Sequence, residues 1–397
     1  MVPEGWKETY LGDVITHKKG FAFNSGLYRD KGIRIVRISD TTRNSVHSEN
    51  PVYLAEEYAE GLESYKLAED DIILSTVGSR PHLLDSMVGK AVKVPLEAGG
   101  SLLNQNLVKV IPKASKITNE YLFEMLKNKR FIFFISTLVR GNANQVSITL
   151  ADLFQYHLVL PPLPEQKKIA QILSTWDKAI TTTEQLLANS QQQKKALMQQ
   201  LLTGKKRLLD HNGVRFGGEW KHKRLLSLCS IKTGKKDVNE GNPEGKYPFF
   251  TCASEPTRSD NYSYDCEAIL VAGNGILGKT HYFKGKFEAY QRTYILSGFN
   301  DIDVHYLHQF ILYWLMRDIE REKQHGAMPY IKLGLLQNFK VLLPCIEEQQ
   351  KIAAVLSVAD QEVTSLQQKL DTLKQEKKAL MQQLLTGKRR VRVDEAA

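Results

Sequence analysis

The chain has 397 residues, which exceeds a typical single domain and leaves room for two domains with separate cores. Hydrophobic residues make up 42% and charged residues 25% of the chain, values of folded proteins that exclude wholesale disorder and a fibrous class. Lysine and arginine outnumber aspartate and glutamate by 54 to 44, and this net charge of +10 favours a polyanionic partner, either nucleic acid or an anionic membrane.

The first module, residues 1–160, combines short strand-like runs with turn residues. Apolar and β-branched residues from Ile33 to Ile38 and from Asp71 to Leu74 predict strands. The segment from Asn119 to Lys129 predicts the one helix of this module. We therefore expect a mixed α and β domain here.

A long helix is predicted for residues 161–208. It begins after the proline-rich segment from Leu160 to Pro164 and then runs about 39 residues without proline or glycine, as far as Gly204. At about 1.5 Å per residue, such a helix is roughly 55–60 Å long.

The second module and a second helix repeat this organisation. Residues 209–343 form the second module, with a strand predicted from Ala268 to Val271 and a helix from Val304 to Arg317. Residues 344–391 then align without a gap on residues 161–208, with 26 identities in 48 positions, and residues 392–397 are a tail. The repeating unit is therefore a module followed by a helix.

Apolar residues recur along both helices at alternating steps of four and three, the pattern of a coiled-coil seam. The seam comprises Ile169, Leu173, Trp176, Ile180, Leu187, Leu197, Leu201, Ile352, Leu356, Val363, Leu366, Leu370, Leu373, Leu380 and Leu384. Polar residues interrupt it at Thr183, Ser190, Lys194 and Lys377, and we expect them to fix its register. The predicted fold is α+β: two mixed α/β domains separated by an antiparallel pair of long helices, in a pseudo-two-fold tandem repeat. An ordinary dimerisation coiled coil would explain the seam, but not why near-identical helices follow two divergent modules.

Residues Gly273 to Thr280 satisfy the phosphate-loop pattern GxxxxGK[ST] and follow an apparent strand. Taken alone, the motif predicts an ATPase or a DNA-stimulated NTPase that uses Lys279. A phosphate loop opens a helix, whereas the residues from His281 onward resemble a strand and a turn. The first module has an analogous stretch from Leu74 to Ala91 without the full motif, so we expect a hairpin common to both modules.

Other catalytic patterns are absent from the sequence. The four cysteines lack CxxC or zinc-finger spacing, and the histidines form no HExxH pair. No nucleophile motif, adenosylmethionine loop or acidic nuclease cluster stands out, so we expect a chain that is not itself an enzyme and binds no metal. No apolar run is long enough to span a bilayer and no secretory signal opens the chain, so we expect a cytoplasmic protein without a membrane partner.

Polar and basic loops in both modules offer side chains suited to phosphates and base edges. The candidate DNA-binding residues of the first module are Lys18, Lys19, Arg34, Arg37, Arg80, Asn104, Gln105, Arg140, Asn142, Asn144 and Gln145. Those of the second module are Lys232, Lys235, Lys236, Arg258, Asn274, Lys279, Gln291, Arg292, Gln324 and Tyr330. Their recurrence in both modules is what favours duplex DNA as the partner.

The two helix sequences carry a family resemblance. Each opens near a proline with Glu-Gln and Ile-Ala, at residues 165–170 and 348–353, and closes with Lys-Lys-Ala-Leu-Met-Gln-Gln-Leu-Leu-Thr-Gly. This combination resembles the specificity subunits of type I restriction–modification systems. The resemblance implies that each module is a target-recognition domain, which reads one half of a bipartite DNA site, and that the paired helices set the spacing. The second helix departs from the first where Cys345-Ile346-Glu347 replaces Pro162-Leu163-Pro164, which puts the equivalence of the two ends in question.

The resemblance also implies partners. Two modification subunits would bring S-adenosylmethionine and adenine methylation, and restriction subunits would bring ATP, magnesium and translocation, so that this chain carries no cofactor. Three alternatives stay open: an ATPase built on Lys279, a purely structural coiled-coil adaptor, and a specificity subunit of a related system whose modification and cleavage activities share one polypeptide.

Overall fold

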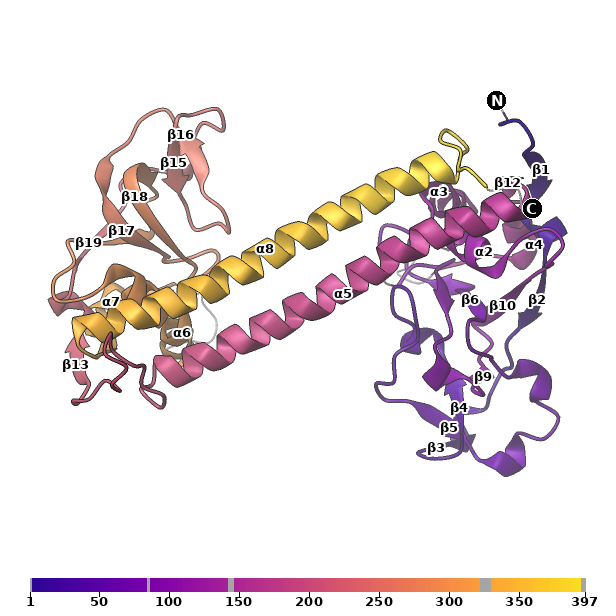
Figure 1. The fold of residues 1–397 in the computed structure, drawn as a ribbon, viewed down its shortest axis with the longest axis horizontal. Helices are drawn as coiled ribbons and strands as arrows, with labels where there is room; N and C mark the ends of the chain where they lie inside the picture. Colours follow the sequence, from indigo (N-terminus) through magenta and orange to yellow (C-terminus); the bar gives the residue numbers. More distant parts are fainter. Residues whose placement is uncertain (1, 84–85, 142–145, 322–329, 394–397) are drawn as a thin grey trace. The chain divides into compact units, whose positions relative to one another are not determined.

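The structure, a computed structural model, describes residues 2–83, 86–141, 146–321 and 330–393. The chain forms two compact units, Met1–Thr182 with Leu370–Ala397, and Thr183–Lys369. Each unit holds one module together with one segment of α5 (Leu163–Leu201) and one segment of α8 (Ile346–Leu384) (Figure 1). The sequence division assigns each helix to the module before it. In the structure each helix contributes to both units. The first part of α5 belongs with the last part of α8, and the last part of α5 belongs with the first part of α8.

The sheets of the first unit have the orders β2-β10-β6-β8, β3-β5-β4-β9, β1-β12 and β11-β7. The strands are β1 (Lys7–Tyr10), β2 (Ile15–Lys19), β3 (Tyr28–Arg29), β4 (Ile33–Val36), β5 (Val52–Leu54), β6 (Ile72–Ser75), β7 (Val77–Gly78), β8 (Ala91–Lys93), β9 (Leu102–Leu103), β10 (Leu107–Pro112), β11 (Val146–Ser147) and β12 (His157–Leu160). The predicted strands from Ile33 and Asp71 correspond to β4 and β6.

The helices of the first module are α1 (Leu11–Val14), α2 (Asn119–Leu126), α3 (Lys129–Leu138) and α4 (Leu150–Phe154). The predicted helix from Asn119 to Lys129 corresponds to α2, which ends earlier, at Leu126. The prediction of a single helix in this module was wrong. The side chain of Asn128 accepts a hydrogen bond from the amide of Phe131 at 2.9 Å, so it caps a separate helix, α3.

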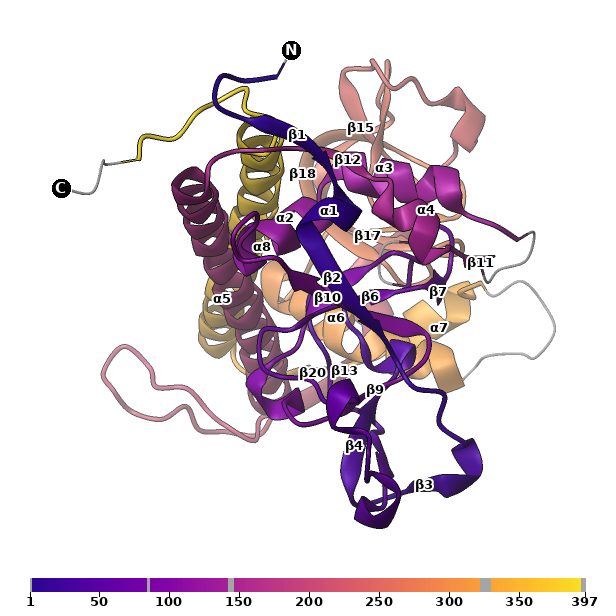
Figure 2. The ribbon, with the colours of Figure 1, turned by 90° about the vertical axis from the view of Figure 1, so that its right-hand side faces the viewer.

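The core of the first unit has α2 between the β2-β10-β6 sheet and the helix segments (Figure 2). Apolar residues of α2 and of strands β6 and β10 form one buried cluster with Ile169 and Leu173 of α5 and Leu384 of α8. The β3-β5-β4-β9 sheet has its own small core around Ile35 and Leu102. The module helix thus attaches the sheet to the paired helices.

The second unit repeats this plan. A six-stranded sheet has the order β14-β19-β17-β18-β15-β16, and β13 pairs with β20. Its elements are β13 (Lys221–Arg224), β14 (Ser230–Thr233), β15 (Tyr247–Phe250), β16 (Thr257–Ser259), β17 (Tyr264–Ala272), β18 (Thr280–Ala289), β19 (Thr293–Ser297), β20 (Lys340–Leu343), α6 (Val304–Arg321) and α7 (Leu333–Asn338). Helix α6 occupies the place of α2, because its buried residues join the sheet to Leu201 of α5 and Leu356 of α8.

The start of each long helix is fastened by the same polar contacts. In the first unit Arg390 makes two hydrogen bonds, of 2.8 and 2.9 Å, to the carboxylate of Glu165, whose side chain is 4% exposed. In the second unit Arg207 makes two of 2.7 Å to Glu348, whose side chain is fully buried. We call each pair a helix latch.

A glutamine next to each latch glutamate joins the helix to its module. Gln166 donates to the carbonyl of Pro161 at 2.9 Å and accepts from the amide of Thr118, the residue that caps α2, at 3.0 Å. Gln349 donates to the carbonyl of Pro344 at 3.0 Å and accepts from the amide of Asp303 at 2.9 Å. The repeated Glu-Gln of the sequence therefore has a structural role, and the departure at Cys345 leaves it intact.

Two further ion pairs mark the register of the helix segments. Lys377 pairs with Asp177 in the first unit, and Lys194 pairs with Asp360 in the second. These are equivalent positions of the repeat, so the two segment pairs run antiparallel with the same offset. Every predicted seam residue is buried or half-buried. Thr183, a polar seam residue, is also buried.

We expect the helix latch of the second unit to be a large contributor to stability. Changing Arg207 to methionine leaves the buried Glu348 carboxylate without its cation, which costs about 3–5 kcal/mol for a buried pair that loses one member. The full chain should then melt at least about 6 °C lower. The matched control is R207M/E348L, which should recover most of the loss because no buried charge is left. A double variant as unstable as R207M would contradict this account.

Candidate nucleic-acid interface

The phosphate-loop pattern of the second module is a β-hairpin turn between β17 and β18. The amide of Ala272 donates to the carbonyl of Lys279 at 2.8 Å, and the amide of Gly278 donates back to Ala272 at 2.9 Å. Thr280 is the first residue of β18, so the motif leads into a strand. A phosphate loop needs a helix at this point to direct amides at the phosphates. The ATPase alternative therefore lacks its structural context.

The first module contains the same hairpin, as the sequence predicts. The amide of Ser75 donates to Lys90 at 3.0 Å, and the amide of Gly89 donates to Ser75 at 2.8 Å. Gly89 and Gly278 both have positive φ angles, of 75° and 74°, which explains the shared glycine. The ammonium of Lys90 is buried and donates to the carbonyl of Thr41 at 3.0 Å. The Gly-Lys pair therefore closes a turn and fastens a loop.

Beside the hairpin, three distant segments of the first module join through backbone hydrogen bonds. A turn closes from the amide of Leu107 to the carbonyl of Asn104 at 2.9 Å. The carbonyl of Asn106 accepts from the amide of Thr76 at 3.0 Å, and the carbonyl of Thr76 accepts from the amide of Ile148 at 3.1 Å. We call this arrangement the turn cradle.

The second module builds the same turn cradle from different residues. Its turn closes from Thr293 to Tyr290 at 2.8 Å. The carbonyl of Arg292 accepts from the amide of Gly273 at 2.9 Å, and the carbonyl of Gly273 accepts from the amide of Ile331 at 2.8 Å. The two cradles therefore share a backbone, while Gln105-Asn106 stands in one and Gln291-Arg292 in the other.

A glycine brings a lysine-rich loop against each turn cradle. A Cβ atom on Gly20 would lie 2.0 Å from the carbonyl oxygen of Asn104, and one on Gly234 would lie 2.1 Å from that of Ala289. Only glycine permits this approach. As a result, basic residues predicted to contact DNA flank the cradle in both modules: Lys18, Lys19, Lys232, Lys235 and Lys236.

The cradle of the second module opens into two adjoining pockets of about 540 and 480 Å³, which share Thr233 and Leu333. Five predicted DNA-binding residues line them: Lys232, Lys235, Gln291, Arg292 and Tyr330. Lys332 lines the first pocket as well. The sequence prediction missed it, because only the bond from Ile331 to Gly273 reveals its place. Of the described residues that line either pocket, none is acidic, so the site suits an anionic ligand.

The equivalent positions of the first module present a different set. Lys19 is exposed, and Gln105 and Asn106 are half-buried. The ammonium of Lys18 lies 4.1 Å from the ring centre of Tyr65, a cation–π contact. The side-chain oxygen of Gln105 is shielded from solvent and has no hydrogen-bond partner among the described residues. A polar group of this kind marks a place where a ligand can supply the missing bond.

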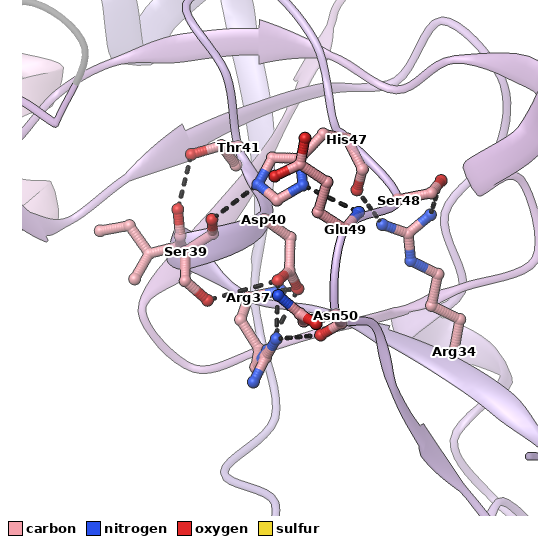
Figure 3. Close-up of polar contacts among 10 residues, drawn as sticks. Arg34, Arg37, Ser39, Asp40, Thr41, His47, Ser48, Glu49 and Asn50 are labelled. Carbon is pink, nitrogen blue, oxygen red and sulfur yellow. Dashed lines mark hydrogen bonds and ion pairs between the residues drawn. The ribbon is translucent and has the colours of Figure 1, made fainter. Parts of the chain in front are cut away.

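Arg34 and Arg37, two predicted DNA contacts, make hydrogen bonds that hold the loop of residues 37–50 together (Figure 3). Arg34 donates to Ser48 at 3.2 Å and also to the carbonyl of His47. Arg37 donates twice to Asp40, at 3.2 and 2.8 Å, and this carboxylate raises the pKa of Arg37. Both guanidinium groups make hydrogen bonds within the module, and their assignment as DNA contacts stays a prediction.

The remaining predicted residues are dispersed. Asn104 is 5% exposed, so its role is in the turn itself. Arg80 donates to the carbonyl of Gly141 at 3.1 Å, and Arg140 pairs with Asp152 at 2.7 Å. Lys236 pairs with Glu240 at 2.7 Å. The structure places Arg258 on β16, and Asn274 and Lys279 within the hairpin turn. Asn142, Asn144, Gln145 and Gln324 lie outside the described residues.

Two buried titratable groups of the second module, His308 and Cys229, are held in their neutral forms. Burial lowers the pKa of His308 to about 4, and the imidazole lies 3.2 Å from the hydroxyl of Thr280. Burial also raises the pKa of the Cys229 thiol to about 12. Within the described ranges, no group of three or more histidine, cysteine, aspartate or glutamate side chains is placed to hold a metal ion. None of the helices described is both long enough and apolar enough to cross a membrane.

The sequence matches the family description "Type I restriction modification DNA specificity domain" over residues 3–189 and 217–375. The EcoDI specificity subunit of a type I restriction enzyme from Escherichia coli is 36% identical over 172 residues, which span 42% of this chain and only 37% of that subunit. The putative MjaX specificity subunit from Methanocaldococcus jannaschii is 25% identical over 98% of this chain and 95% of its own length.

Two solved structures share the fold. The S subunit of a type I restriction–modification system from M. genitalium aligns with a TM-score of 0.68 at 16% identity, covering 97% of this chain and 96% of that one. A chain from a study of the assembly and conformational transition of the type I system aligns with a TM-score of 0.54 at 20% identity, covering 98% and 99%.

Proposed function

The chain belongs to the type I restriction–modification DNA specificity family, and from this premise we propose that each of its modules reads one half of a bipartite DNA site. The observation that carries the proposal is the turn cradle, because both modules build the same backbone and fill it with different polar side chains. One scaffold with two side-chain sets suits two different half-sequences.

We propose further that the paired helices set the spacing between the halves. The latches and the ion pairs Lys194–Asp360 and Lys377–Asp177 support this, because they fix one antiparallel register in both units. The positive charge of the chain provides affinity for the phosphate backbone that is independent of sequence.

Membership of this family implies a complex with DNA and with other restriction–modification subunits. We propose two modification subunits, one for each unit, and restriction subunits that translocate and cleave DNA. In this proposal the chain itself has no catalytic role and acts in the cytoplasm. S-adenosylmethionine, ATP and magnesium are then bound by its partners. A related system with a fused modification and cleavage polypeptide is the second candidate, which the neighbouring genes distinguish.

The test is to express the chain with its modification partners in a host that lacks them and to sequence the host DNA for N6-methyladenine. We expect a methylated motif in two parts with a fixed gap, present only when this chain is expressed. Methylation that does not depend on the chain, or one uninterrupted motif, would contradict the proposal.

A further inference from the structure

The two turn cradles share a glutamine and differ in the residue that follows it, and this difference points to residues that choose the DNA sequence. Gln105 and Gln291 occupy the same turn position, as do Asn106 and Arg292. Resting on the proposed function, we propose that these two turns meet base edges and that Asn106 and Arg292 set the difference between the two half-sequences.

Hydrogen bonding leaves these side chains available. At Asn106 and Arg292 the backbone carbonyl, and not the side chain, holds the cradle together, through the amides of Thr76 and Gly273. Arg292 is exposed and lines the larger pocket. A substitution at either position therefore changes the presented chemistry without removing a bond of the cradle.

The lysines around the turns can bind DNA phosphates beside the side chains that contact bases. Lys19 in the first module and Lys232, Lys235 and Lys332 in the second are exposed, and the last three line the adjoining pockets. Ammonium groups of this kind bind phosphates and position a protein on the duplex, while amide and guanidinium groups read bases. In the second module both kinds line the adjoining pockets, and in the first Lys19 pairs with Val108, two residues after Asn106.

The chemistry of each side chain predicts a base. A guanidinium pairs with the O6 and N7 acceptors of guanine, and a carboxamide pairs with the N6 and N7 groups of adenine. We therefore assign to Arg292 a guanine in the half-sequence of the second module. To the glutamine common to both turns we assign an adenine in each half, and to Asn106 a second adenine in the half read by the first module.

The test uses the full complex carrying R292N, which makes the two turns alike at this position, and the reciprocal N106R. We expect R292N to relax one guanine position in one half of the methylated motif, with a loss of discrimination on the order of 5- to 150-fold, and to leave the other half unchanged. N106R should alter only the other half. The matched control is R224N, because Arg224 is an exposed arginine of the same module, at the end of β13, that lines neither pocket and is not a candidate DNA-binding residue. This variant should keep the motif.

The outcomes separate this inference from the proposed function. If the unmodified complex methylates a bipartite motif and both R292N and N106R leave it unchanged, the inference is overturned and the proposed function stands. If the unmodified complex yields no bipartite motif, the proposed function fails first. If R292N abolishes methylation, the affinity of the variant complex for the recognised duplex and for unrelated duplexes should be compared in a competition binding assay. Loss of affinity for the recognised duplex alone supports the inference, and an equal loss for unrelated duplexes overturns it.

Discussion

Replacing residues 1–160 with the first module of another family member is expected to change one half of the methylated motif completely and to preserve the other half and the gap. The reason lies in how the module attaches. Gln166 of α5 contacts the module through the backbone amide of Thr118, at 3.0 Å, so this contact does not depend on which side chains the new module carries. Methylation-aware sequencing of a host that carries the hybrid system measures the result.

The design should retain the side-chain contacts that cross the junction, among them the buried ion pair of Glu124 on α2 with Lys377 of α8, at 3.2 Å. The indole of Trp6 donates to the latch residue Glu165 at 3.1 Å, so the donor module needs a tryptophan at this position. The matched control exchanges residues 209–343 instead, which should alter the opposite half only. A hybrid in which both halves change would show that the modules do not read DNA independently.

Local patterns made the helical framework predictable from the sequence. The seam positions of both helices follow a simple periodicity. Helices α5 and α8 begin two residues after the start of the predicted segments 161–208 and 344–391, and they end seven residues before the end of these segments. The polar seam residues Lys194 and Lys377 were identified from the same pattern, and the structure supplies their partners, Asp360 and Asp177. The shared hairpin was predictable because its glycine and lysine recur in both modules.

The candidate site was less predictable, because it depends on contacts between distant segments. Gly273, Arg292 and Ile331 meet through two backbone hydrogen bonds that no local pattern encodes. Residue type suggested Arg34 as a DNA contact, and the sequence did not reveal that its guanidinium donates to Ser48 within the module. The equivalence of Asn106 and Arg292 likewise appears only when the two cradles are compared bond by bond.

Lengthening the paired helices by one heptad is expected to widen the gap in the recognised site. The structure shows why both helices must be extended. Seven residues inserted into α5 alone, between Glu184 and Ser190, would move Lys194 away from Asp177 with no matching change between their partners on α8. A second heptad between Ser365 and Leu370 keeps both ion pairs in register.

The paired insertion adds about 10 Å of helix, which corresponds to roughly three base pairs at 3.4 Å each. Insertion in α5 alone is the matched control, and we expect it to weaken or abolish methylation because one segment pair loses its register.

Sequencing the methylated motif of the paired-insertion variant beside that of the unmodified chain tests the central claim most directly, because it reads both half-sequences and the gap in one experiment. We predict the same two half-sequences with a gap longer by about three base pairs. A motif with its original gap would contradict the claim that the matched helices set the distance between two independently read halves.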